Sequence, residues 1–150
     1  MPRTFAQILA GFAALKPADF DLMRLGSDGP ERLNALTDEL LLLPNPERGI
    51  RAMFEVMENM PDSDLGSPGP LVHALEQMSG QYESELVESL KRRPTALAVW
   101  MVNRILNATD TSRQREFYLD VLRSVAGHPD ASRTVREDAL GYIEYQGGAA

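Results

Sequence analysis

The chain has 150 residues, 43% of them hydrophobic, and it contains no cysteine and only two histidines. This composition excludes a disulfide framework, a thiol nucleophile and a zinc site of the usual Cys/His type, although the length suffices for one core without such supports. The formal net charge of −7 is unevenly divided, because residues 1–90 carry 15 acidic and 6 basic side chains whereas residues 91–150 carry 7 acidic and 9 basic ones.

Ten prolines stand at the edges of segments whose apolar residues recur at helical spacing. We interpret the first segment as a helix rather than a signal peptide, because it has no clear small-residue cleavage site. No segment alternates apolar and polar residues as a strand does, and no apolar run approaches the roughly 20 residues that cross a bilayer. We therefore expect an all-α protein, residues 1–150 forming a single domain of about eight helices in antiparallel pairs. In chain order, the expected helices cover about residues 5–15, 30–43, 46–60, 71–78, 82–92, 95–107, 111–126 and 132–145.

Polar residues at several helix starts have the spacing of N-terminal caps. Thr4 with Gln7 and Thr111 with Gln114 fit the capping box, in which two side chains and two backbone N–H groups satisfy each other. Asn45, which precedes a proline, is expected to cap the third helix. The seventh helix is expected to bury Phe117, Tyr118, Val121, Leu122 and Val125.

The longest interruption between helices covers residues 62–70, and a second non-helical stretch covers about residues 146–150. The first is rich in Asp, Ser, Gly and Pro and is expected to be an exposed loop, and the second a flexible tail. Asp62, Asp64 and Gly66 suggest a calcium loop, but the glycine comes one place early and the twelfth position is His73 instead of Glu. His73 also lies three residues before Glu76, yet a single such pair is more typical of structural packing than of a metal site. We predict no metal ligand, no cofactor and no catalytic residue, since phosphate-loop, dinucleotide and nucleophile-elbow motifs are absent from the sequence.

One face of the largely apolar helix over residues 95–107 is polar and aromatic: Trp100, Asn103, Arg104 and Asn107 recur at helical spacing. Burying neutral polar groups without partners costs about 1–3 kcal/mol each. We therefore expect bonds to neighbouring helix ends or loops, and contact with a ligand is the less favoured alternative.

Acidic side chains dominate the first 90 residues. Each short run is typical of a solvated helix face, but together the side chains disfavour nucleic acid and anionic membranes as partners. They favour a protein with a basic patch, which would be steered in quickly at low salt. The predicted partner-binding residues are Asp19, Asp21, Glu55, Glu58, Asp62, Asp64, Glu83, Glu85 and Glu88.

Two resemblances bear on architecture and function. The run from Val135 to Leu140 is similar to the second helix of a HEAT repeat, which implies a HEAT-like right-handed array or an irregular bundle. The stretch from Arg92 to Asn107, with the helices after it, resembles the all-α immunity proteins encoded beside bacterial polymorphic or secreted toxins, over about residues 66–146. That family implies a cytoplasmic, non-enzymatic protein that binds and neutralises a cognate toxin domain. The alternative is a HEAT-like scaffold or adaptor with another protein partner.

Overall fold

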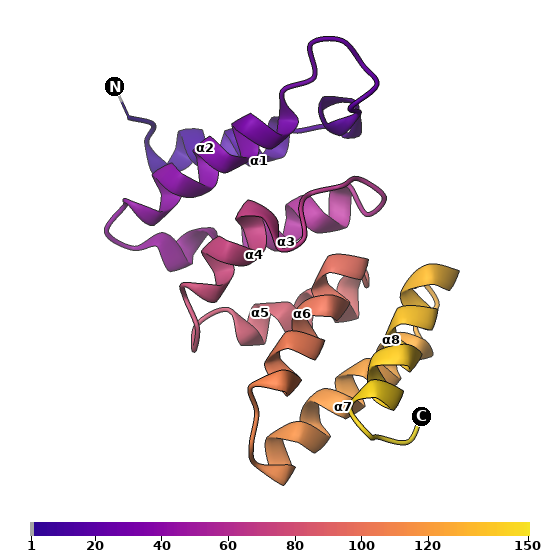
Figure 1. Cartoon of the computed structure of the whole chain (residues 1–150). Coiled ribbons are helices and arrows are strands. Elements are labelled where there is room, and N and C mark those ends of the chain that lie inside the picture. The colour runs from indigo at the N-terminus through magenta and orange to yellow at the C-terminus, as the bar shows by residue number, and fades with distance from the viewer. Residues whose placement is uncertain (1) are drawn as a thin grey trace. The chain divides into compact units, whose positions relative to one another are not determined.

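The computed structural model describes residues 2–150, and this part of the chain is all-α, as the sequence predicts, with no strand. Two short 3-10 helices, Pro17–Phe20 and Pro46–Gly49, accompany eight α-helices (Figure 1). No helix in this range is long and apolar enough to cross a membrane. The α-helices are α1 (Phe5–Ala14), α2 (Gly29–Leu41), α3 (Ile50–Asn59), α4 (Gly69–Glu76), α5 (Glu83–Arg92), α6 (Ala96–Asn107), α7 (Ser112–Ala126) and α8 (Arg133–Tyr145).

The contacts divide the chain into two compact units, Met1–Glu85 and Leu86–Ala150, and α5 crosses the boundary in the chain. In the first unit, α1 packs against α2 and α3, and α2 packs against α4 (Figure 1). The predicted capping box is present at α1, where the Gln7 N–H donates to Thr4 Oγ1 and the Thr4 N–H donates to Gln7 Oε1. The helices are held together by buried apolar side chains that include Ile8, Phe12, Leu33, Leu40, Met53, Phe54, Leu71 and Leu75.

In the second unit, α6, α7 and α8 pack against one another in all three pairings. Thr95, Thr111 and Ser132 cap these three helices by accepting a backbone N–H three residues on. The buried apolar side chains include Val99, Val102, Leu106, Leu122, Val125, Val135, Ala139 and Ile143.

The polar face of α6 has structural partners just beyond the end of α8. Gln146 Nε2 donates to Asn103 Oδ1 and to Asn107 Oδ1, each at 2.8 Å. Arg115 Nη2 in turn donates to Gln146 Oε1 at 3.0 Å, and the Arg104 guanidinium lies 4.9 Å from the centre of the Trp100 ring. Asn103 is buried, with 8% of its surface exposed, so the bond from Gln146 gives a partner to a polar side chain that has little access to water. The expectation of bonds to a neighbouring helix end is confirmed for the two asparagines.

Two local predictions were wrong. Asn45 precedes a 3-10 helix and makes no capping hydrogen bond with its side chain, and Gly49 holds the N-cap position of α3. Phe117 is 53% exposed, because two residues of helix rotate it about 200° from the buried Leu119. Its ring packs edge-on against Tyr118 instead, with the two ring centres 5.1 Å apart. Tyr118 and Val121, also expected to be buried, are half-buried.

Residues 62–70 do not form one continuous exposed loop. Asp62 and Asp64 are exposed, but Leu65 is buried, and α4 already begins at Gly69. Residues 146–150 follow α8: the Gly148 N–H donates to the carbonyl of Ile143 at 2.9 Å, and the Ala149 carbonyl accepts from Arg123 Nε at 2.8 Å.

Candidate functional site

The uneven charge of the chain follows the division into units. The first unit carries 14 acidic and 6 basic side chains, and the second carries 8 acidic and 9 basic ones. Within the first unit, Arg3 pairs with Glu39 and Arg51 with Glu55, while the Arg48 guanidinium lies 4.1 Å from the centre of the Phe5 ring. A net charge of −8 therefore remains on about 85 residues, which gives this unit a negative electrostatic potential.

The segment of residues 20–27, between α1 and α2, is closed at its base by one arginine. Arg32 Nη1 lies 3.3 Å from Asp19 Oδ2, before the segment, and 3.3 Å from Asp28 Oδ1, after it. Gly29 allows the two ends to meet, because a Cβ atom at this position would lie 2.5 Å from the carbonyl oxygen of Asp19. Residues 20–27 thus form a compact loop with adjoining ends, which we call the apolar loop.

Hydrogen bonds within the apolar loop hold its tip in a fixed turn. The Met23 N–H donates to Asp21 Oδ1 at 3.0 Å, and the Arg24 N–H donates to the Asp21 carbonyl at 3.0 Å. Gly26 follows with a φ of +81°, a backbone conformation that side-chain-bearing residues rarely adopt. These backbone contacts set the direction of the chain at the tip of the apolar loop. The conformation of the loop therefore does not depend on burying the side chains at its tip.

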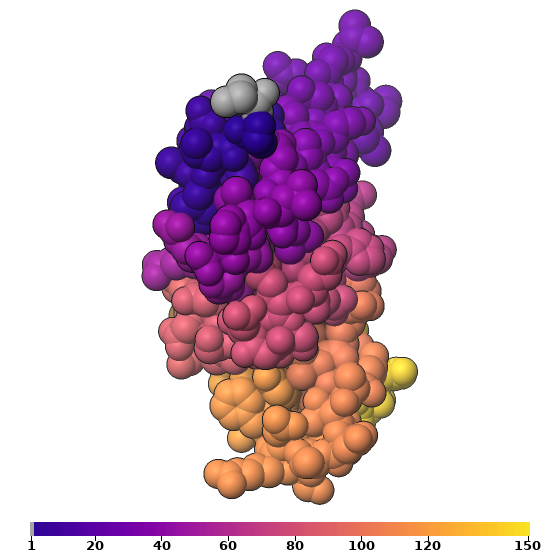
Figure 2. Space-filling model, turned by 90° about the vertical axis from the view of Figure 1, so that its left-hand side faces the viewer, coloured from indigo at the N-terminus to yellow at the C-terminus, as the bar shows by residue number. Residues whose placement is uncertain are grey.

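Three large apolar side chains at this tip face solvent. Leu22 is 78% exposed, Met23 94% and Leu25 101%. Figure 2 shows the segment between α1 and α2 standing out from the first unit, at the top of the view. Single exposed apolar residues are common on soluble proteins, but three within four residues form a contiguous patch, the kind of feature that marks interaction sites.

A pocket of about 230 Å³ adjoins the apolar loop. It lies within the first unit and is mainly apolar, with the Asp64 carboxylate the one ionisable group in its lining. Asp64 Oδ1 accepts from the Gly66 N–H at 3.0 Å, which orders the loop that forms this wall. The volume is below the roughly 300–1,000 Å³ typical of sites for drug-sized ligands, so the pocket suits a single protruding side chain. The lining residues are Phe20, Leu22, Pro30, Leu33, Asp64, Leu65, Gly66 and Pro70.

Of the nine predicted acidic residues, one is in the lining of this pocket, and two others are chain neighbours of a lining residue. Asp64 lines it, while Asp19 and Asp21 flank Phe20 in the chain, whose side chain is part of the lining. Asp62 is exposed two residues before Asp64. These carboxylates also order the backbone, since Asp19 Oδ2 accepts from the Lys16 N–H at 2.8 Å.

The other five predicted acidic residues lie on α3 and α5. On α3, Glu55 is exposed, with its carboxylate 3.9 Å from Arg51 Nε, and Glu58 is half-buried one turn later. On α5, both carboxylate oxygens of Glu83 accept from the Gly80 N–H at 2.9 Å, Glu85 is half-buried, and Glu88 pairs with Lys91 at 3.3 Å. Glu83 points about 200° away from Glu85 around the helix axis, so these three glutamates do not form one face.

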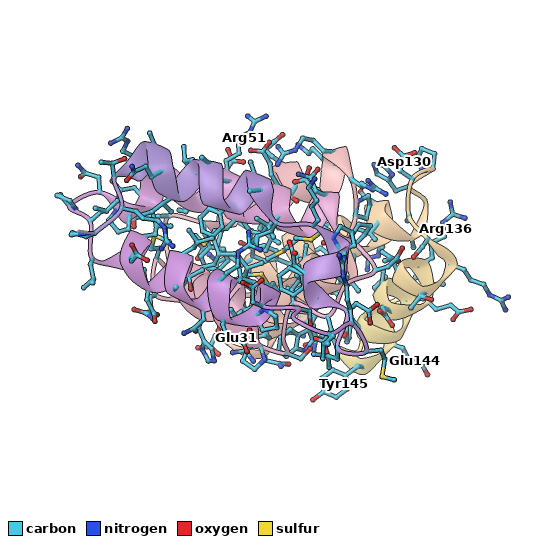
Figure 3. The ribbon with its side chains drawn as sticks, turned by 90° about the horizontal axis from the view of Figure 1, so that it is seen from above. Glu31, Arg51, Asp130, Arg136, Glu144 and Tyr145 are labelled. Atoms are coloured by element: carbon cyan, nitrogen blue, oxygen red, sulfur yellow. The ribbon has the colours of Figure 1, made fainter. Side chains whose placement is uncertain are left out.

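Sequence reasoning missed the apolar tip and two acidic residues at the base of the loop. Leu22, Met23 and Leu25 are not part of a pattern of apolar residues at helical spacing. The feature of the sequence that could have indicated the tip is a cluster of large apolar residues in a turn between Asp and Gly. Asp28 and Glu31 are both exposed, and the Glu31 side chain points away from α2 in Figure 3. They bring further negative charge to the loop base.

The two histidines lie in different units and have different surroundings. His73 is exposed at the edge of an open groove between α2 and α4, together with Asn34 and Asp38. His128 Nδ1 accepts from the Asp130 N–H at 3.0 Å, so Nε2 carries the proton and donates to the Lys91 carbonyl at 2.7 Å. Within residues 2–150, no three His, Cys, Asp or Glu side chains are arranged to hold a metal ion.

Shifted pKa values occur on α7 and α8, in the second unit. Burial raises the pKa of Asp138, and the charge of Glu137 adds to the shift. Burial also raises the pKa of Tyr142, with a smaller contribution from Asp138. Hydrogen bonds to Glu116 and Asp120 raise the pKa of Arg123. All of these groups lie on α7 and α8, far along the chain from the apolar loop.

Comparison of the chain with protein-family models, curated proteins and solved structures finds no match in any of the three.

Proposed function

We propose that this protein binds a partner protein without turnover, and that the partner is a cognate bacterial toxin domain with a basic patch, which the protein neutralises in the cytoplasm. The observation that carries the proposal is the excess of eight negative charges on the first unit, gathered in part around an exposed apolar loop. The resemblance of Arg92 to Asn107 and the following helices to all-α immunity proteins supports the choice of a toxin as partner.

Charge complementarity determines how such a complex forms. A basic toxin domain is attracted to the acidic unit over roughly a Debye length, about 8 Å at physiological salt. Association is therefore fast at low salt and slows as salt rises, whereas the dissociation rate depends mainly on the desolvated centre of the interface. A neutralising protein of this kind needs a long-lived complex, and it needs no catalytic group.

Coexpression tests the proposal. The toxin gene expected beside the gene for this protein is expressed alone and together with it, and growth and copurification of the two proteins are measured. We expect growth to be restored only by coexpression, with a complex that survives gel filtration. Failure to restore growth, together with no complex at micromolar concentration, would exclude the toxin as partner and leave a scaffold or adaptor role as the alternative.

A further inference from the structure

We infer that the apolar loop and the adjoining pocket are the energetic centre of the binding surface, and that their occupant is a basic protein segment that carries a bulky apolar side chain. The identity of the occupant as a protein rests on the proposed function. The location of the centre and the chemistry of the occupant go beyond it, because the predicted interface consisted of carboxylates alone.

The apolar loop is presented to solvent in an ordered form. Its base is tied by Arg32 to Asp19 and Asp28, and its tip is turned by hydrogen bonds to Asp21. Little backbone conformational entropy remains to be lost on binding, so apolar contacts at Leu22, Met23 and Leu25 contribute to affinity without the cost of ordering the chain. Interfaces concentrate their binding energy in such desolvated apolar centres, surrounded by polar rims.

The pocket accepts a side chain from the partner. Phe20, Leu33 and Leu65 are buried in its wall, and Leu22 joins the pocket to the exposed tip. A partner can therefore contact the tip and insert an apolar side chain beside it in one continuous surface. Asp64, also in the wall, gives the opening a negative charge that favours Arg or Lys next to the inserted side chain.

The charges around the apolar loop select among three possible occupants. The loop base and pocket carry five carboxylates, on Asp19, Asp21, Asp28, Glu31 and Asp64, against two guanidinium groups, on Arg24 and Arg32. A second copy of the same surface would bring these net negative charges together, and an anionic membrane would also repel them. A basic protein segment is attracted, and it is the occupant to which we commit.

A displayed library of random short peptides is the probe, because it needs no knowledge of the toxin. Wild-type protein is the target, and bound peptides are then measured against a variant with Leu22→Ser, Met23→Ser and Leu25→Ser. Leu42→Ser is the matched control, since Leu42 is 85% exposed in the same unit but lies outside the apolar loop. All four side chains are exposed, so we expect unchanged melting temperatures.

We expect selected peptides to contain Arg or Lys beside an aromatic or aliphatic residue, and to bind the triple-serine variant about tenfold more weakly or worse. Asp64→Asn should weaken the same peptides at low salt and less at high salt. Peptides without basic residues, peptides that bind the triple-serine variant as well as wild type, or no enrichment at all would overturn the inference.

Two further measurements address the other occupants. In sedimentation of the protein alone, we expect either a monomer or a dimer that Leu25→Ser leaves intact. In flotation with phosphatidylglycerol vesicles, we expect no bound protein. A dimer or vesicle binding that depends on the apolar loop would overturn the inference. If the toxin is neutralised equally well by the triple-serine variant, the inference fails while the proposed function stands. If peptides bind through the loop but no toxin is neutralised, the proposed function fails alone.

Discussion

Arg32 and Asp19 join the start of α2 to the chain ahead of the apolar loop: Nη1 of Arg32 lies 3.3 Å from Oδ2 of Asp19. The same nitrogen lies 3.3 Å from Oδ1 of Asp28, so one guanidinium spans the residues on both sides of the loop. The tip presents Leu22, Met23 and Leu25 to solvent, so burial of these side chains does not order the loop. The Arg32 contacts and the turn at Asp21 order it instead.

Replacing Arg32 with Met should loosen the apolar loop while leaving the helices intact. Both ion pairs are partly exposed, so we expect a loss of only about 0.5–1 kcal/mol in the free energy of unfolding. The Met23 and Arg24 amides should exchange with deuterium faster than in wild type, as measured by mass spectrometry or NMR. Arg51→Met is the control, because its partner Glu55 is four residues away on the same helix and outside the loop. Equal exchange at the loop in both variants would show that the Arg32 contacts do not order it.

Gly29→Ala should destabilise the protein because the added Cβ would meet backbone. It would lie 2.5 Å from the Asp19 carbonyl oxygen, so the chain must shift, at a cost of about 1–3 kcal/mol. Gly141→Ala is the matched control, since Gly141 lies on α8 with no atom close to the new Cβ. In that open position alanine should stabilise by roughly 0.5–1 kcal/mol through its higher helix propensity. Urea unfolding measures both effects, and equal stability of the two variants would contradict the close approach at Gly29.

Gln146→Met should cost about 1–3 kcal/mol, because it removes the donor to the buried Asn103 oxygen while keeping the side-chain length. The control is Glu144→Ala, whose exposed side chain points away from α8 in Figure 3, and we expect a change within about 0.5 kcal/mol. Thermal and urea unfolding provide the comparison. A Gln146→Met variant as stable as the control would mean that water replaces the lost donor.

Asp138→Asn should change how stability depends on pH. Burial, followed by the charge of Glu137, raises the Asp138 pKa in the folded protein, so the folded state holds this proton more tightly than the unfolded chain. The resulting stabilisation is fully present below the ordinary unfolded pKa of about 3.9 and is lost as pH rises through the raised folded pKa. The variant should therefore be more stable than wild type at neutral pH, with an advantage that shrinks toward about pH 4.

Urea unfolding across this pH range measures the difference, and tyrosine absorbance gives a second readout. Removing the Asp138 charge should lower the pKa of Tyr142, while burial, the larger cause, keeps it above the ordinary value. A stability difference that does not vary with pH would contradict the shift at Asp138.

Local signals in the sequence predict most of the fold, whereas the candidate site depends on contacts that local signals do not contain. Thr4 and Thr111 mark their helix starts correctly because capping acts over three residues. Gln146 contacts Asn103 across 43 residues of sequence, and Arg32 joins Asp19 across a loop, and neither contact follows from helical periodicity. The exposure of Leu22 and Leu25 depends on the fold around their turn, because large apolar residues are usually buried.

Tertiary contacts also distinguish the predicted acidic residues from one another. Asp64 lines the same pocket as Phe20, the chain neighbour of Asp19 and Asp21, and composition does not reveal this contact. Glu83 and Glu85, by contrast, are a cap and a half-buried side chain, so reversing them to Lys would alter stability as well as charge. Isosteric neutralisation near the apolar loop is the cleaner test of the acidic surface.

The most direct test of a binding surface formed by the acidic first unit is the affinity for the cognate toxin domain after the changes Asp21→Asn, Asp62→Asn and Asp64→Asn. Asparagine keeps the oxygens that accept from Met23 and Gly66, so the loops stay in place while three charges are lost. The control removes three exposed carboxylates from the second unit, with Asp110→Asn, Asp130→Asn and Glu144→Gln. Calorimetric titration at low and high salt should show Kd at least about tenfold weaker for the first variant, with a shallower salt dependence, and little change for the control. Equal Kd values for both variants, or no measurable complex with the wild-type protein, would contradict the proposed surface.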